Sequence, residues 1–197
     1  MGDRNAHTAT IHFPQLFYLF GLVTLFAAPH WTDHLLSFYH ACRKKWFFVL
    51  MCAGLVALVI RYNTLVHPYL LADNRHYTFY IWKRVFEYRP WGRYALIPLY
   101  LFGAYATYQT MSKTKNFLFA LVFIGCSMIA LVPQRLLEIR YFFIPYLFVR
   151  LHIEPRSWAS LFIEFIMYAV LNTATIYLFV TRPFFWPDSD LVQRFMW

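Results

Sequence analysis

The sequence contains few charged residues, few cysteines and none of the common motifs for nucleotide binding or serine catalysis. Only 14% of its 197 residues are charged, whereas soluble domains carry about 25%. No Walker loop, glycine-rich phosphate cradle or G-x-S-x-G turn occurs. The three cysteines form no CxxC motif and are odd in number, so we expect Cys52 and Cys126 to be free thiols buried in apolar segments.

Acidic residues are also scarce. Nine Asp and Glu stand against 18 Lys and Arg, which gives a formal net charge of +9. In a soluble protein this excess would suggest nucleic acid as the partner. Here most basic residues lie between apolar runs. We therefore expect membrane lipids or an anionic lipid substrate as partners, and no nucleic acid.

Long apolar runs dominate the rest of the chain, which is 60% hydrophobic and 22% aromatic. A helix needs about 20 apolar residues to cross a bilayer, whereas a barrel strand needs only about 10 with alternating polarity. The apolar runs of this chain are longer than barrel strands, so we expect them to be helices. We predict an all-α polytopic transmembrane bundle that forms one unit over residues 1–197, with membrane segments at 13–29, 46–60, 94–111, 117–132, 136–152 and 158–181.

Residues 1–12 are polar, so no signal peptide is expected, and such a start would also suit a chain cut from something larger. Two His and an Asp (His7, His12, Asp3) lie near the start beside Arg4. Metal sites need ligands at fixed spacing, and no second ligand cluster provides one. We expect no metal.

The stretch 61–93 holds six of the 18 Lys and Arg and leaves the orientation open. The positive-inside rule favours a cytosolic location, but the same charge would arise if the stretch binds an anion on the luminal side. Within it, residues 76–89 have Tyr77, Tyr80, Arg84 and Tyr88 on one helical face, which predicts an interfacial helix. The alternative is the aromatic belt of an ordinary membrane helix.

The most polar connection, 67–77 (HPYLLADNRHY), contains Asp73, Asn74, Arg75 and His76. Asp and Asn can hydrogen-bond sugar hydroxyls, and Arg and His can hold a phosphate. The alternative is a solvated loop with a turn at Asp73-Asn74.

A second polar cluster, 133–141 (PQRLLEIRY), follows the fourth apolar segment. As a helix it would place Gln134, Glu138 and Tyr141 on one face, with an ion pair available between Arg135 and Glu138. Ionisable groups at membrane depth usually face a bundle interior or a cavity, although this pair could simply neutralise itself. Glu164, inside the last segment, is either a third functional group or a carboxyl that pairs with a neighbouring helix.

The stretch HPYLLADNRHYTFYIWKRVF (67–86) resembles the dolichyl-phosphate-glucose α-1,2-glucosyltransferases of the endoplasmic reticulum. The likeness extends to GDRNAH, HFPQLFY, VPQRLLEIRYFFIPY (132–146) and WPDSDLVQRFMW (186–197), in the order of the family. It covers nearly the whole chain but only the C-terminal portion of family members.

This resemblance implies a multi-pass protein of the endoplasmic reticulum membrane with part of a type C glycosyltransferase fold. The donor would be dolichyl phosphate glucose, the acceptor a diglucosylated oligosaccharide on dolichyl pyrophosphate, and the reaction a luminal, cofactor-free inverting transfer. Residues 61–93 would then be luminal. The alternative function is a non-enzymatic membrane partner, such as a potassium-channel regulator.

Family members carry an acidic residue, thought to be the catalytic base, in an N-terminal half that this chain lacks. The resemblance therefore implies no catalytic residue here and no activity of this chain alone. It implies substrate contact by seven residues of the two polar clusters: Asp73, Asn74, Arg75, His76, Arg135, Glu138 and Arg140.

Overall fold

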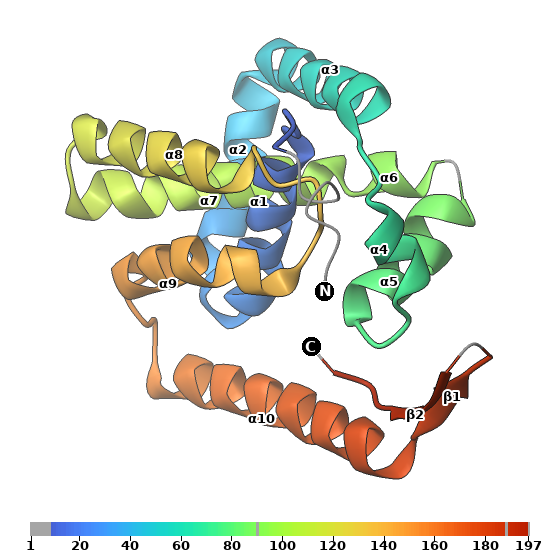
Figure 1. Ribbon diagram of the computed structural model, residues 1–197. Coiled ribbons are helices and arrows are strands. Elements are labelled where there is room, and N and C mark those ends of the chain that lie inside the picture. Colours follow the sequence, from blue (N-terminus) through green and yellow to red (C-terminus); the bar gives the residue numbers. More distant parts are fainter. Residues whose placement is uncertain (1–8, 90, 188, 197) are drawn as a thin grey trace.

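The computed structural model describes residues 9–89, 91–187 and 189–196 and is mostly helical (Figure 1). The long helices are α1 (Pro14–Phe26), α2 (Thr32–Lys44), α3 (Trp46–Asn63), α7 (Ile97–Thr114), α8 (Phe117–Leu131), α9 (Phe143–His152) and α10 (Trp158–Thr181). The short ones are η2 (Ala28–His30), α4 (Pro68–Ala72), α5 (Tyr77–Ile81), the π-helix η3 (Trp82–Glu87), α6 (Gly92–Ala95) and η4 (Ile139–Phe142). The strands β1 (Phe184–Trp186) and β2 (Ser189–Gln193) follow.

The core forms around α1, which packs against α3, α7, α8 and α9. Its closest neighbour is α7, because Gly103 lets the two backbones approach. A Cβ at that position would lie 2.2 Å from the Phe20 carbonyl oxygen and 2.6 Å from Thr24 Oγ1. Small residues permit such approaches in membrane proteins, where tight packing joins the helices. Leu19 and Val23 of α1 are buried in the same hydrophobic cluster as Phe102 and Ala106 of α7.

Sequence signals account for the starts of several helices. Pro14 occupies the first turn of α1, where no backbone N–H is needed. The Asn116 side chain accepts a hydrogen bond from Phe119 N at the start of α8, at 3.0 Å. Ser157 and Ser160 form a reciprocal capping box that begins α10.

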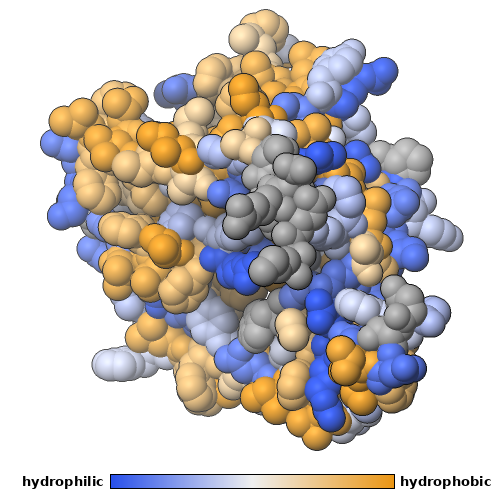
Figure 2. Space-filling view, viewed as in Figure 1, coloured by the Kyte–Doolittle hydropathy of each residue, from blue (hydrophilic) through white to orange (hydrophobic). Residues whose placement is uncertain are grey.

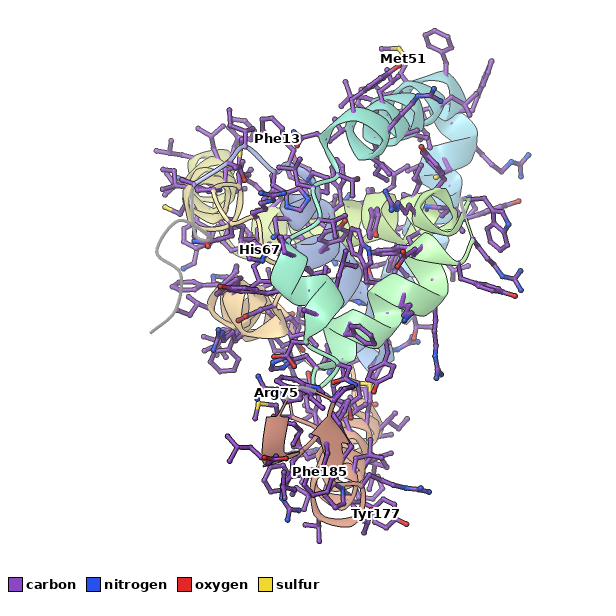
Figure 3. All side chains as sticks on the ribbon, turned by 45° about the vertical axis from the view of Figure 1, so that its right-hand side comes forward. Phe13, Met51, His67, Arg75, Tyr177 and Phe185 are labelled. Atoms are coloured by element: carbon purple, nitrogen blue, oxygen red, sulfur yellow. The ribbon has the colours of Figure 1, made fainter. Side chains whose placement is uncertain are left out.

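Apolar side chains cover much of the outer surface. On α3, Trp46, Phe47, Leu50, Met51 and Leu55 are exposed, and α10 shows a similar row. Figure 2 shows hydrophobic surface over α3, α8 and α10, and Met51 in Figure 3 points away from the body. Both α3 and α10 are long and apolar enough to cross a membrane. Exposed apolar area of this extent marks a surface that meets something other than water.

Each of the six apolar segments contains a helix, but its bounds differ from those expected from sequence. The segment 136–152 becomes an α-helix only at Phe143. The predicted all-α fold class is also incomplete, because β1 and β2 form an antiparallel hairpin. In this hairpin Phe184 pairs with Gln193 and Phe185 with Val192. Pro187, after β1, favours the turn between the strands. All three cysteines are free, but the expected burial was wrong: Cys52 is half-buried and Cys126 is exposed on the outer side of α8.

A buried polar cluster attaches α10 to the rest of the molecule. Arg150 on α9 donates from Nε and Nη2 to the two carboxylate oxygens of Glu164, each at 2.6 Å. His30 Nε2 lies 3.0 Å from Glu164 Oε2. Tyr168 donates to the Phe26 carbonyl oxygen at 3.1 Å and contacts Tyr146 through the two hydroxyls. Glu164 thus follows the pairing alternative, and the pairing fixes the helix that carries the C-terminal hairpin.

Candidate substrate site

A cavity of about 660 Å³ brings the two polar clusters together. Five of the seven predicted site residues line it: Asp73, Arg75, His76, Glu138 and Arg140. Figure 3 shows Arg75 where the segment after α4 meets the C-terminal hairpin. The remaining wall comes from Tyr69, Leu70, Ala72, Thr78, Leu136, Leu137, Trp186 and Pro187. Charged and aromatic side chains from three separate parts of the chain therefore converge on one space.

Arg75 is held from three sides. Its Nε and Nη2 donate to the two oxygens of Asp73 at 2.8 and 2.6 Å. Its Nη1 donates to Gln193 Oε1 at 3.2 Å, and its guanidinium lies 4.9 Å from the centre of the Trp186 ring. A bidentate carboxylate and an aromatic face together fix the plane of a guanidinium. The geometry leaves further N–H groups of Arg75 available to an incoming anion.

Asp73 remains ionised in this arrangement. Partial burial by itself would raise the pKa of Asp73, but the hydrogen bonds and positive charge of Arg75 outweigh it, so the pKa lies below its usual value. The Asp73 carboxylate raises the pKa of Arg75 in turn. His76 Nε2 lies 3.4 Å from Asp73 Oδ2. Asp73 therefore anchors the side chains of both Arg75 and His76.

The C-terminal hairpin supplies side chains that sequence reasoning missed. Trp186 Nε1 donates to Asn74 Oδ1 at 2.9 Å, and the backbone N–H of Met196 donates to the Arg75 carbonyl oxygen at 2.7 Å. Together with Gln193, these contacts hold the segment 73–76 against the hairpin. The only signal in the sequence was the match of the terminal WPDSDLVQRFMW to the resembled family, which assigns no role to individual residues.

Residues 133–138 do not form the predicted helix, since α8 ends at Leu131 and η4 begins at Ile139. The Gln15 side chain explains the difference: its Nε2 donates to the carbonyl oxygens of Gln134 and Leu136, at 2.9 and 3.0 Å. Glu138 pairs with Arg140 and not with Arg135, so the expected Arg135–Glu138 pair was wrong. Glu138, whose backbone is extended, and Arg140, in the first turn of η4, both line the cavity.

The buried side chain of His12 links the segment before the first polar cluster to the second polar cluster. Its Nε2 accepts a hydrogen bond from Leu65 N at 3.3 Å, and its Nδ1 lies 3.3 Å from the Gln134 carbonyl oxygen. These partners require the neutral tautomer with the proton on Nδ1. Burial lowers the pKa of His12 to about 4, with a further contribution from the charge of Arg135. Through His12 and Gln15, the stretch HFPQ (12–15) therefore holds the chain around Leu65 close to the second polar cluster.

Two predicted residues lie outside the cavity lining. Asn74 is engaged by Trp186, and Arg135 Nη2 donates to the Val66 carbonyl oxygen at 3.2 Å. Both support the walls. Asp3, Arg4 and His7 lie outside the described residues. Within residues 9–89, 91–187 and 189–196, no group of three His, Cys, Asp or Glu could hold a metal.

Comparison with known proteins gives one consistent family. The sequence profile of the DIE2/ALG10 family matches residues 1–151. A human protein called "Dol-P-Glc:Glc(2)Man(9)GlcNAc(2)-PP-Dol alpha-1,2-glucosyltransferase" is 40% identical over 199 residues, covering 100% of this chain and 42% of its own length. Proteins of the same name from Mus musculus and Drosophila melanogaster are 42% and 37% identical, with 42% and 44% of their lengths covered.

The chain thus spans less than half the length of these curated relatives. The family profile covers the cavity residues of the two polar clusters, whereas Trp186 and Pro187 lie beyond the profile and within the span matched by these relatives. No solved structure matches the chain.

Proposed function

Because this chain belongs to the DIE2/ALG10 family, we propose that its cavity binds substrate in an α-1,2-glucosyltransferase of the endoplasmic reticulum. The donor would be dolichyl phosphate glucose, and the acceptor the diglucosylated oligosaccharide on dolichyl pyrophosphate named by the relatives. The observation that carries the proposal is the convergence of Arg75, His76 and Arg140 with two carboxylates and Trp186 on one space. The names of these relatives describe no channel partner, so that alternative is not pursued.

The proposal includes a membrane location. The exposed apolar rows on α3 and α10 would face lipid, and the shorter apolar helices α1 and α8 would lie in the same layer. We infer a polytopic bundle of six segments with part of a type C glycosyltransferase fold. The cavity would open on the luminal side, where a phosphorylated polyprenol presents its headgroup.

The charges of the cavity suit both parts of the donor. Transfer breaks the bond between C1 of glucose and the phosphate oxygen, so negative charge grows on the leaving dolichyl phosphate. Arg140, whose side chain is 76% exposed, and Arg75 could bind that phosphate with the N–H groups that Glu138 and Asp73 leave open. The ring of Trp186 offers an apolar face to a sugar.

The cavity lacks an unpaired carboxylate among its lining residues. Asp73 is paired with Arg75, and Glu138 with Arg140. An inverting displacement needs a base within hydrogen-bond reach of the attacking hydroxyl, and the lowered pKa of Asp73 makes it a weak one. We therefore assign these residues to binding and expect no glucose transfer by this chain alone.

A chimera tests the proposal. This chain replaces the matching portion of a full-length relative, and transfer from dolichyl phosphate glucose is measured in microsomes. We expect Arg75→Ala to lower transfer about 10- to 100-fold, because a charged hydrogen-bonding partner of the phosphate is lost. Arg156→Ala is the matched control, since Arg156 lies outside the cavity in an exposed pair with Asp33.

Equal transfer by the Arg75→Ala and parent chimeras, at equal protein level, would remove Arg75 from the substrate site. Transfer by the 197-residue chain alone would show that a base is present within it. A chimera that folds but transfers no glucose would overturn the proposed function of this cavity.

A further inference from the structure

A second cavity, of about 630 Å³, lies on the segment that joins the polar connection to α6. It is lined by Phe79, Tyr80, Lys83, Arg84, Tyr88 and Arg89. It shares no lining residue with the cavity around Arg75. Three of its six lining residues are cationic and none is acidic, so it differs from the first cavity, in which carboxylates balance the cations.

The π-helix η3 creates this arrangement. Trp82 and Phe86 are buried, with ring centres 5.2 Å apart, and fix one side of the helix to the core. The backbone N–H of Tyr88 donates to the Lys83 carbonyl oxygen, the five-residue spacing of a π-helix. Residues five apart then return to the same side. Lys83 and Tyr88 consequently face the cavity together, and Arg84 and Arg89, the second of which lies beyond the end of η3, complete its basic lining.

Aromatic rings hold the cations in place. Lys83 Nζ lies 5.4 Å from the centre of the Phe79 ring, and the Arg84 guanidinium 5.6 Å from that of Tyr80. Arg89 lies 5.3 Å from the Trp91 ring. None of the ion pairs in the described part of the chain includes Lys83, Arg84 or Arg89. Three positioned cations without a carboxylate partner favour an anion at this place.

The surroundings indicate which anion. Ile81, Val85, Tyr88 and Trp91 are exposed beside the cations. Aliphatic and aromatic side chains next to Lys and Arg are the pattern of a membrane interface, where rings sit at headgroup depth and basic groups meet lipid phosphates. A free phosphate ion would use the cations but not the apolar side chains.

We infer that this second cavity binds the phosphate headgroup of an acidic glycerophospholipid of the surrounding bilayer. The site is separate from the transfer cavity, and the inference rests on the proposed membrane location. Its role would be to fix the depth of η3, and with it the segment 73–76, at the headgroup layer.

Native mass spectrometry of the detergent-purified chain tests the inference. The chain is titrated with phosphatidylinositol, phosphatidylcholine, dolichyl phosphate or inorganic phosphate, and retained ligand is counted. We expect preferential retention of phosphatidylinositol, weakened roughly 10- to 100-fold in the triple variant Lys83→Gln, Arg84→Gln, Arg89→Gln. The control is Lys44→Gln, Lys45→Gln, Lys113→Gln, which removes the same charge from exposed positions on α2, α7 and the residue after α2.

Several results would overturn the inference. Equal weakening in both triple variants would show a general effect of net charge. Equal retention of phosphatidylcholine would show no recognition of charge. Preferential retention of dolichyl phosphate, or inorganic phosphate bound as tightly as lipid, would exclude a glycerophospholipid. Circular dichroism of both variants confirms that each is folded. No glucose donor is present, so this test fails or succeeds independently of the transfer assay.

Discussion

Arg75 lies with its guanidinium 4.9 Å from the centre of the Trp186 ring, although the two residues belong to the loop after α4 and to the C-terminal strand β1. This contact makes Trp186 a positioning residue for Arg75. In the chimeric enzyme, we expect Trp186→Ala to raise KM for dolichyl phosphate glucose roughly 3- to 30-fold, the range of a cation–π contact.

The Trp186→Phe variant should lie between Ala and the parent, because it keeps a ring but loses the hydrogen bond to Asn74. Trp158→Ala is the control, since Trp158 is exposed at the start of α10. A fall in kcat with unchanged KM for Trp186→Ala would contradict a role of Trp186 in positioning Arg75.

The pair between Arg150 and Glu164 should dominate the attachment of α10. Glu164 has a side chain only 8% exposed and two 2.6 Å hydrogen bonds to Arg150. We expect Glu164→Gln to destabilise the chain by about 3 kcal/mol, since it leaves a largely buried guanidinium without its counter-charge. The measurement is thermal unfolding in detergent, followed by tryptophan fluorescence.

Glu154→Gln provides the matched control for Glu164→Gln, because Glu154 is exposed in the connection before α10. Its melting temperature should equal that of the parent. Equal melting temperatures for the Glu164 and Glu154 variants would mean that the buried cluster does not hold the helix.

Gly103 and Gly125 should respond differently to the same added methyl group. At Gly103 a Cβ would clash with the Phe20 carbonyl oxygen, whereas at Gly125 nothing lies within 4 Å. We expect Gly103→Ala to destabilise the chain by about 1–3 kcal/mol through separation of α1 and α7. Gly125→Ala should be neutral or stabilising by up to about 1 kcal/mol. Melting temperatures in one detergent check both, and a stabilised Gly103 variant would contradict the close helix contact.

His12 should make stability depend on pH in acid. Its pKa falls from 6.5 to about 4 on folding, because burial disfavours the charged ring. The unfolded chain therefore binds the proton first. Stability should be complete above about pH 6.5 and decline by roughly 3 kcal/mol as pH falls to about 4. His12→Gln should show a smaller difference in melting temperature between pH 7 and pH 4.5. An identical difference would show that His12 does not titrate on unfolding in this range.

Sequence reasoning succeeded where the residues of one short stretch were enough to predict its structure or role. Apolar runs placed a helix in every predicted segment. Residue type alone singled out residues 73–76, of which Asp73, Arg75 and His76 line the cavity and Asn74 does not. The grouping of Glu138 and Arg140 with them followed from the family resemblance. Whether the six segments cross a membrane stays a prediction, supported by the exposed apolar rows of α3 and α10.

Sequence reasoning failed where distant side chains decided the conformation. Gln15 bonds the carbonyl groups of Gln134 and Leu136, which a helix over 133–141 would have used internally, and it lies more than a hundred residues away in the chain. Trp186 and Gln193 were missed for the same reason, since their partner Arg75 is remote in sequence. Helical periodicity depends only on residues that are close in sequence, so it does not predict contacts with residues that are remote in sequence.

Arg75 is synthesised before the C-terminal hairpin that holds its side chain. Gln193 follows Arg75 by 118 positions, which takes a ribosome roughly 6 to 24 s to add at 5–20 residues per second. During that interval the arginine has emerged without its aromatic and amide supports. The arrangement around Arg75 therefore exists only after α10 has formed and the final strand has folded back, so a nascent or prematurely terminated chain would have the charges of the cavity without their alignment.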